Sequence, residues 1–318
     1  MIERYCDAHC DTAMQMYLHG LPLDSEKLHC HLPAVKRMGK LAQVFAFCTT
    51  CWKTEEQPQA LYRNALANLH RELELHSKDA ILCGNSSDVF AAWDRGVPLA
   101  VIPALEGAEA IHCDPGLLEE AARDGIRMIS LVWNHENALG GSHVTGGGLT
   151  AQGREFVRRA QKLGILIDVS HGSDALFYDV CEISERPIIA SHSNSRAVCA
   201  ASRNLTDDMF RCLVELGGCA GTNLYGPFLQ TEGVPSLDSV RKHLEHFLDL
   251  GGAGHLCLGG DWDGMDKLPD GVTGVDGWPK LIQTLSDCGW SERALSDYAS
   301  ETFLRVLDAA GAKSTAVE

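Results

Sequence analysis

The chain has 318 residues, and its 27 Lys and Arg against 43 Asp and Glu give a net charge of −16. Such an acidic chain argues against a nucleic-acid partner, because binding phosphates requires a positively charged face. The first residues lack the basic and apolar regions of a secretory signal, and no apolar run reaches membrane-spanning length, so we expect a cytoplasmic protein with no membrane partner.

Strand-like apolar runs and helical patterns alternate along the chain. The strands are expected to begin near residues 4, 43, 98, 126, 165, 187, 218 and 255. After a loop and a short helix over 13–40, helices are expected at about 58–77, 115–124, 151–163, 173–183, 206–216, 236–250, 278–286 and 291–310. Leu61, Ala65, Leu69 and Leu73, for instance, recur at the spacing of an amphipathic helix.

This alternation of strands and helices predicts the fold class. Repeated strand–helix units imply a parallel sheet, and eight of them imply a closed (β/α)₈ TIM barrel; an open doubly wound sheet is the alternative. No linker or low-complexity segment divides the chain, so we expect a single barrel domain over residues 1–318 with the C-terminal helices packed on it.

Two of the thirteen cysteines have a distinctive spacing. Cys48 and Cys51 are separated by two residues, as in redox pairs and zinc sites, but no second pair of this kind completes a structural zinc site. A cytosolic chain keeps its thiols reduced, so we expect free thiols at both positions.

Residues of the kinds that bind metals follow several predicted strands at the point where each strand ends. In chain order these are His9 and Asp11, then Glu106, His171, His192 and Asp261. Each alone has an ordinary explanation, as a buried histidine satisfied by backbone or as an acid in a turn. Because the carboxyl ends of barrel strands meet at one rim, where the chemistry of such barrels lies, the set together predicts a metal site.

The number of these residues favours two ions. Two histidines, together with a His-x-Asp pair, exceed the needs of one tetrahedral site with an open position. A carboxylate such as Glu106 can bridge paired ions, which activate a water and polarise the bond under attack. Asp261 is then the expected general base or proton shuttle beside that water.

Two further features are less specific. Arg203 can hold a substrate carboxylate through its planar fork, or it can serve a surface salt bridge or a helix start. The glycine runs at 146–148 and 259–260 match neither a phosphate loop nor a dinucleotide fingerprint, so they give no support to nucleotide binding.

With these residues identified, the chain resembles the membrane (renal) dipeptidase family, the M19 metallopeptidases with amidohydrolase-type barrels. The matching stretches are 7–11 (Asp-Ala-His-Cys-Asp), 105–107 (Leu-Glu-Gly), 131–137 (Leu-Val-Trp-Asn-His-Glu-Asn), 166–171 (Leu-Ile-Asp-Val-Ser-His), 191–193 (Ser-His-Ser), 202–204 (Ser-Arg-Asn) and 259–264 (Gly-Gly-Asp-Trp-Asp-Gly). They span most of the chain in the order in which the family has them.

The resemblance implies a role for each residue of the site. One Zn²⁺ is expected on His9 and Asp11 and a second on His171 and His192, with Glu106 bridging the two ions. Arg203, with Tyr225, is expected to hold the free carboxylate of a dipeptide. Asp261 is expected to hydrogen-bond the bridging water and to pass its proton to the leaving amine.

One position departs from the family. Its mammalian members carry a substrate-contacting histidine in the fourth strand's stretch, where this chain has Trp133, with Asn134 and His135 close by. His135 is the expected substitute. Those members are also secreted and lipid-anchored, and since neither signal is present here, the chain is most similar to a bacterial cytosolic relative.

The resulting prediction is a zinc-dependent dipeptidase that cleaves L,L- and L,D-dipeptides by attack of a bridging hydroxide. The alternatives are another binuclear amidohydrolase, acting on an N-acyl amino acid, a cyclic amide or a lactone, and a non-catalytic metal-binding relative. The sequence leaves the oligomeric state open, with a homodimer as one alternative.

Overall fold

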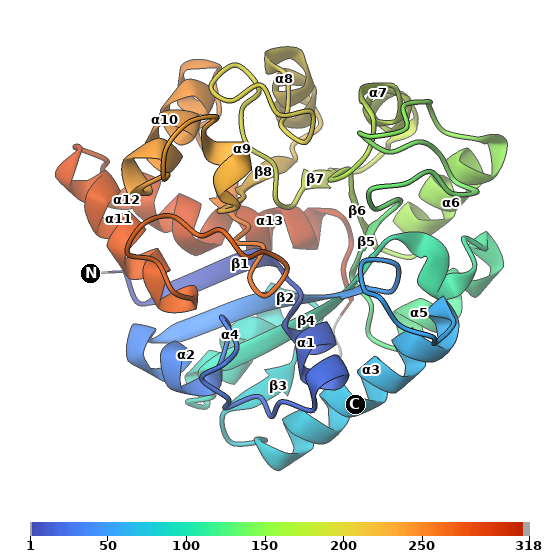
Figure 1. Ribbon diagram of the computed structural model, residues 1–318, viewed down its shortest axis with the longest axis horizontal. Coiled ribbons are helices and arrows are strands. Elements are labelled where there is room, and N and C mark those ends of the chain that lie inside the picture. The colour runs from blue at the N-terminus through green and yellow to red at the C-terminus, as the bar shows by residue number, and fades with distance from the viewer. Residues whose placement is uncertain (1, 314–318) are drawn as a thin grey trace.

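The computed structural model describes residues 2–313, in which parallel strands form a closed barrel surrounded by helices (Figure 1). The strands are β1 (Arg4–Cys10), β2 (Lys40–Cys48), β3 (Ala80–Leu82), β4 (Leu99–Glu106), β5 (Met128–Ser130), β6 (Leu166–Asp168), β7 (Ile189–Ala190), β8 (Cys219–Thr222) and β9 (Leu256–Leu258). Their order is β2-β1-β9-β8-β7-β6-β5-β4-β3, and pairing of β2 with β4 closes the ring. This closure confirms the eight-stranded barrel and excludes the open sheet.

The ninth strand, β3, was not expected from the sequence. It pairs with residues 99–101 of β4, while β5 pairs with residues 104–106 and β2 pairs along the whole length of β4. Because β2 pairs along the full length of one edge of β4, both β3 and β5 pair with the other edge. A three-residue strand between two helices carries too few residues to show a period-two pattern.

Helices cover the outside of the barrel, and most lie where the sequence predicts them. They are α1 (Thr12–His19), α2 (Leu32–Met38), α3 (Pro58–Leu75), α4 (Ser86–Asp94), α5 (Leu118–Arg123), α6 (Ala151–Lys162), α7 (Asp174–Ile183), α8 (Asp207–Glu215), α9 (Gly226–Leu229), α10 (Leu237–Asp249), α11 (Trp278–Asp287), α12 (Glu292–Ser296) and α13 (Thr302–Ala309). Among the described residues, no helix combines the length and apolar character that a bilayer crossing needs.

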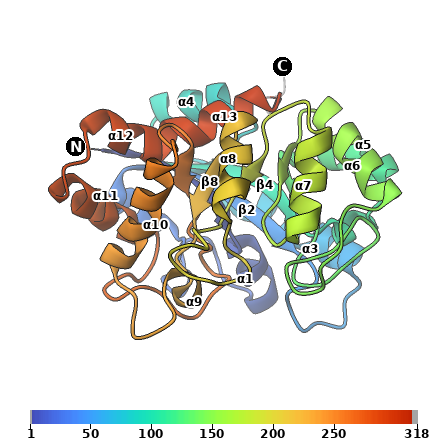
Figure 2. The same cartoon turned by 90° about the horizontal axis from the view of Figure 1, so that it is seen from above.

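The C-terminal helices close one end of the barrel. The helix expected over 291–310 is a continuous run in which α12 and α13 are joined by one wider turn, η4 (Asp297–Glu301). Phe303, Leu304 and Leu307 of α13 are buried against inward-facing strand residues such as Ala8 and Ala42. In Figure 2, α4 and α13 lie at one end of the barrel, and the long loops gather at the other.

Candidate metal centre and active site

The five predicted metal ligands lie together at the carboxyl ends of the strands. His9 is in β1 and Asp11 follows it, Glu106 ends β4, His171 comes three residues after β6, and His192 two residues after β7. Oε1 of Glu106 lies 3.5 Å from Nε2 of His9, 2.8 Å from Nε2 of His171 and 3.4 Å from Nε2 of His192. All five residues are buried.

These side chains form two overlapping groups of ligand atoms. One comprises His9, Asp11 and Glu106, the other Glu106, His171 and His192, and within each group the ligand atoms lie within 4.8 Å of one another. Both ring nitrogens of His9 and Oδ1 of Asp11 are buried without a hydrogen-bond partner. Because buried polar atoms are rarely left unsatisfied, these orphaned atoms fit metal ligation, and their nitrogen and oxygen chemistry suits zinc-like divalent ions.

Hydrogen bonds fix the ring nitrogens of the other two histidines. Nδ1 of His171 lies 2.8 Å from the amide oxygen of Asn134, which can only accept. Nδ1 of His192 lies 2.7 Å from Oγ of Ser191, whose hydroxyl donates to Asp168 at 2.6 Å. Both histidines therefore carry the proton on Nδ1, and their Nε2 lone pairs, 3.0 Å apart, point toward Glu106 and are available to a metal.

Charges in the centre shift several pKa values. Burial favours the neutral form of Glu106, but the charge of His9 and the close approach of the three imidazoles outweigh it and hold the pKa of Glu106 well below its usual range. Burial lowers the pKa of His9, but the negative charges of Glu106 and Asp11 outweigh burial and raise this pKa well above its usual value. Burial, followed by repulsion from Glu106, raises the pKa of Asp11 to about 7. Metal binding at this group must therefore displace protons.

Asp261 adds a second carboxylate at the same rim. Its Oδ1 lies 3.9 Å from Nε2 of His9, and its Oδ2 accepts a hydrogen bond from Asn223 at 3.1 Å. Burial raises the pKa of Asp261 to about 6, although His9 opposes this. The residue has a φ of 60°, a left-handed conformation that is costly for a residue with a Cβ and that is often found at functional sites.

The adjacent glycine makes room for this arrangement. A Cβ on Gly264 would lie 2.2 Å from Oδ2 of Asp11 and 2.8 Å from Oδ1 of Asp261. Only glycine therefore allows the backbone of this loop to approach both carboxylates so closely.

A buried carboxylate links the first strand to the loop after the last. Asp7 accepts hydrogen bonds from the backbone N–H groups of His9 and Gly260 and from the indole N–H groups of Trp262 and Trp278, at 2.7–3.0 Å. These contacts hold the ends of β1 and β9 in register. His9 and Asp261 are thereby kept on the same side of the rim.

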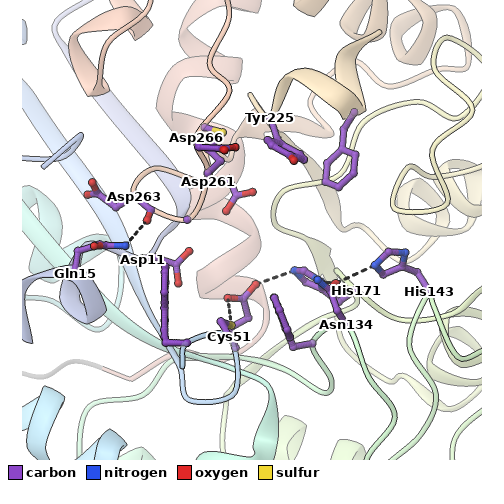
Figure 3. Close-up of a pocket in the computed structure, with 16 residues that line it drawn as sticks. Asp11, Gln15, Cys51, Asn134, His143, His171, Tyr225, Asp261, Asp263 and Asp266 are labelled. Carbon is purple, nitrogen blue, oxygen red and sulfur yellow. Dashed lines mark hydrogen bonds and ion pairs between the residues drawn. The ribbon is translucent and has the colours of Figure 1, made fainter. Parts of the chain in front are cut away.

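A cavity of about 460 Å³ opens over three of the predicted metal ligands, Asp11, Glu106 and His171 (Figure 3). Its lining includes Asp11, Glu106, Asp261 and Tyr225, together with Asn134 and His143. Acidic groups and His171 therefore lie on its floor, and polar and aromatic side chains form its walls. A volume of this size accommodates a small polar molecule.

The structure places the predicted substrate-contacting histidine, His135, outside the cavity and a different histidine, His143, in its lining. The side chain of His135 is 44% exposed, lies 3.5 Å from Glu109 and is absent from the cavity lining. His143 lines the cavity, with its two ring nitrogens 2.9 Å from Ser202 and from Asn134. It lies in a glycine-rich loop without a helical or strand pattern, so no signal in the sequence singled it out.

Arg203 is buried, so the expected alternatives of a surface salt bridge or a helix start do not apply. Its guanidinium donates to Oγ of Ser193 at 2.9 Å and to the carbonyl of His192 at 3.3 Å, while its Nε lacks a partner. The hydroxyl of Thr206 caps α8 instead. Arg203 lies behind the cavity lining and directly contacts the backbone of a predicted ligand.

The expectation of free thiols at Cys48 and Cys51 is wrong for the state seen here. The structure joins the two sulfurs in a disulfide, with the Cα atoms 5.6 Å apart. The chain turns where β2 ends, which brings the two Cα atoms into the range of disulfide geometry. Spacing alone did not reveal this turn.

Comparison with known proteins identifies a family model that spans almost the whole chain and a curated relative that covers most of it. The family model described as "Membrane dipeptidase (Peptidase family M19)" matches residues 3–317. An uncharacterised protein from the pqqA 5′ region of Klebsiella pneumoniae is 33% identical over 250 residues, which cover 74% of this chain and 92% of that protein.

Two solved structures share the fold over almost the whole chain. The dipeptidase AC, a metallopeptidase of family M19, has a TM-score of 0.88 and 27% identity, covering 96% of this chain and 98% of that one. A metallopeptidase from Rhodobacter sphaeroides, liganded with a phosphinate mimic of the dipeptide L-Ala-D-Ala, has a TM-score of 0.86 and 26% identity, covering 96% and 99%.

Proposed function

Because the chain belongs to the membrane dipeptidase family, peptidase family M19, and is a metallodipeptidase, we propose that it cleaves small L,L- and L,D-dipeptides with two zinc ions. In this proposal His9 and Asp11 hold one ion, His171 and His192 hold the other, and Glu106 bridges them. The observation that carries it is the convergence of three imidazole nitrogens on one buried oxygen of Glu106.

Two zinc ions, when bound, supply Lewis acidity and lower the pKa of the attacking water. The residues of the chain do the rest. Asp261, at the edge of this centre and open to the cavity, accepts the proton of the attacking water and delivers it to the leaving amine. In the metal-free protein burial raises the pKa of Asp261 to about 6, which makes this carboxylate a stronger proton acceptor than an exposed aspartate.

The carboxylate end of the dipeptide is assigned to Arg203 and Tyr225. The unpartnered Nε of Arg203 and its fixed guanidinium favour an anionic partner. Tyr225 lines the cavity. The imidazole that contacts substrate is assigned to His143, which lines the cavity, in place of the predicted His135, which does not. The dipeptide mimic bound to the Rhodobacter relative supports a D-residue on the carboxyl side.

A panel of substrates tests the proposal. Metal-free protein reconstituted with zinc is assayed against L-Ala-L-Ala, L-Ala-D-Ala, the C-terminal amide of L-Ala-D-Ala and N-acetyl-L-alanine. Both free dipeptides are expected to be cleaved. The C-terminal amide is expected not to be cleaved, because it lacks the carboxylate that Arg203 and Tyr225 are proposed to bind.

If the amide and the free acid were cleaved equally, Arg203 would not be the residue that binds the substrate carboxylate. Hydrolysis of the N-acyl amino acid alone would identify a different amidohydrolase. Two bound ions without any hydrolysis would identify a non-catalytic relative.

A further inference from the structure

The Cys48–Cys51 disulfide lies in the wall of the proposed active site. In the pairing of β2 with β4, Cys48 is directly opposite Glu106. Sγ of Cys51 lies 3.9 Å from Oε2 of Glu106, and the dashed line from Cys51 in Figure 3 marks this contact. Oε1 of Glu106 faces the three histidines, so the two oxygens of this carboxylate face different sets of donor atoms.

The two sulfurs and Glu106 also form a group of ligand atoms. They all lie within 4.8 Å of one another, as do the atoms of the histidine groups. Two sulfurs and a carboxylate suit a thiophilic divalent ion such as zinc, cobalt or cadmium. Other cysteines also lie close together, such as Cys219 and Cys257 with sulfurs 3.6 Å apart. Within residues 2–313, however, Cys48 and Cys51 are the only cysteines that belong to such a group.

We propose that Cys48 and Cys51 form a redox-controlled metal position beside the histidine centre. In the disulfide state seen here the position is closed. After reduction, the two sulfurs bind one thiophilic divalent ion that shares Glu106, and the two thiol protons pass to solvent. The proposal rests on the role of Glu106 in the proposed centre and is independent of which dipeptide is cleaved.

The accessibility of the two sulfurs determines how the reduction proceeds. Cys48 is fully buried, whereas Cys51 is partly exposed and lines the cavity. One sulfur of a reducing dithiol therefore attacks Sγ of Cys51, and the sulfur of Cys48 leaves and takes up a proton. The second sulfur of the dithiol then closes its own disulfide and releases Cys51 as a thiol. Two electrons and two hydrogens pass from the dithiol to the protein.

Cobalt binding to the reduced and oxidised full-length protein tests the proposal. One sample is reduced with a phosphine, which takes its oxygen from water and becomes the phosphine oxide, and the other is oxidised with a cyclic disulfide; both reagents are removed before Co²⁺ is added. The reduced protein is expected to bind one more cobalt ion per chain and to show a sulfur-to-cobalt charge-transfer band. Reoxidation of the same sample is expected to remove both.

Variants locate the additional ion. Cys51→Ser is expected to abolish the extra ion and the band in the reduced state. A matched double variant, Cys181→Ser with Cys212→Ser, removes a cysteine pair on α7 and α8 outside the cavity and is expected to retain both. The wild-type comparison between redox states needs no variant, so it remains decisive if Cys51→Ser does not fold.

Equal cobalt stoichiometry in the two redox states, or a band that persists in Cys51→Ser, would overturn the proposal. Failure of the proposed function is distinguished by a separate result. If the oxidised, zinc-loaded protein cleaves no dipeptide, the function is wrong, whereas the redox difference in cobalt binding is measured without any substrate.

Discussion

Replacing Ser191 with alanine tests whether the hydrogen bond behind His192 tunes metal binding. The hydroxyl accepts from Nδ1 of His192 at 2.7 Å and donates to Asp168 at 2.6 Å. Asp168 keeps its hydrogen bonds from the hydroxyl of Ser130 and from the backbone N–H groups of Ser170 and Ser191. The loss therefore falls on His192, whose Nδ1–H is left without its acceptor.

Leaving a buried donor unsatisfied costs about 1–3 kcal/mol. Removing the partner of a metal-binding histidine typically weakens metal binding by roughly 10–100-fold, or about 1.4–2.7 kcal/mol. The two magnitudes agree, so we expect a loss of affinity in this range at one of the two metal positions. Competition with a chromophoric chelator at fixed pH measures it.

The control variant is Ser173→Ala. Its hydroxyl accepts from the backbone N–H of Leu176 and caps α7, so its removal is expected to cost about 1 kcal/mol of folding stability without weakening metal binding. A Ser191→Ala protein that binds metal within twofold of wild type would refute the inferred role of this hydrogen bond.

Three further predictions concern the carboxylates. Asp261→Asn should lower kcat by roughly 10²–10⁴-fold because the proton acceptor is lost; a drop below tenfold at unchanged metal content would argue against this role. Burial raises the pKa of Asp11 to about 7, and Glu106 and Asp11 raise the pKa of His9 despite its burial. Above about pH 7 the histidines of lowered pKa, such as His143 and His171, are neutral in both states. The folded metal-free protein then holds protons that the unfolded chain releases, so its stability should fall as pH rises from about 7. Thermal melts between about pH 7 and 8.5 check this, and zinc should reverse the trend; a melting temperature that rises with pH in the metal-free protein over this range would contradict it. Asp7→Ala leaves the indole N–H groups of Trp262 and Trp278 unpaired and should cost about 2–6 kcal/mol, measurable by chemical denaturation with tryptophan fluorescence, and a cost below about 1 kcal/mol would show that water replaces the carboxylate.

The predicted ligand residues could be read from the sequence because they occur at the ends of strands. A parallel barrel brings the carboxyl ends of all its strands to one rim, whatever the loops between them do. His9, Glu106 and His192 are therefore brought together by strand position alone. The hydrogen-bond partner of His192 is its neighbour Ser191, and Asp168, the partner of Ser191, ends the preceding strand β6.

The residues that line the walls of the cavity could not be predicted from strand positions, because they lie in loops. Asn134, His135 and His143 belong to one long connection, and which side chains of this connection turn inward depends on its path over the rim. The sequence favoured His135 because it lies beside the position at which the resemblance to the family implies a histidine, whereas the cavity lining contains His143. Loop paths are decided by contacts between distant segments, which no local pattern encodes.

The sequence by itself determined the barrel and the set of polar residues at its rim, because alternation along strands and helices is a local property that repeats through the chain. Only the tertiary structure decided that Arg203 is buried, that Cys48 and Cys51 are joined, and that one oxygen of Glu106 faces histidines while the other faces sulfur. The disulfide depends on the turn at the end of β2, and the other two facts depend on distances between segments far apart in the chain. Such distances are set by packing of the whole barrel rather than by the residues adjacent to each site.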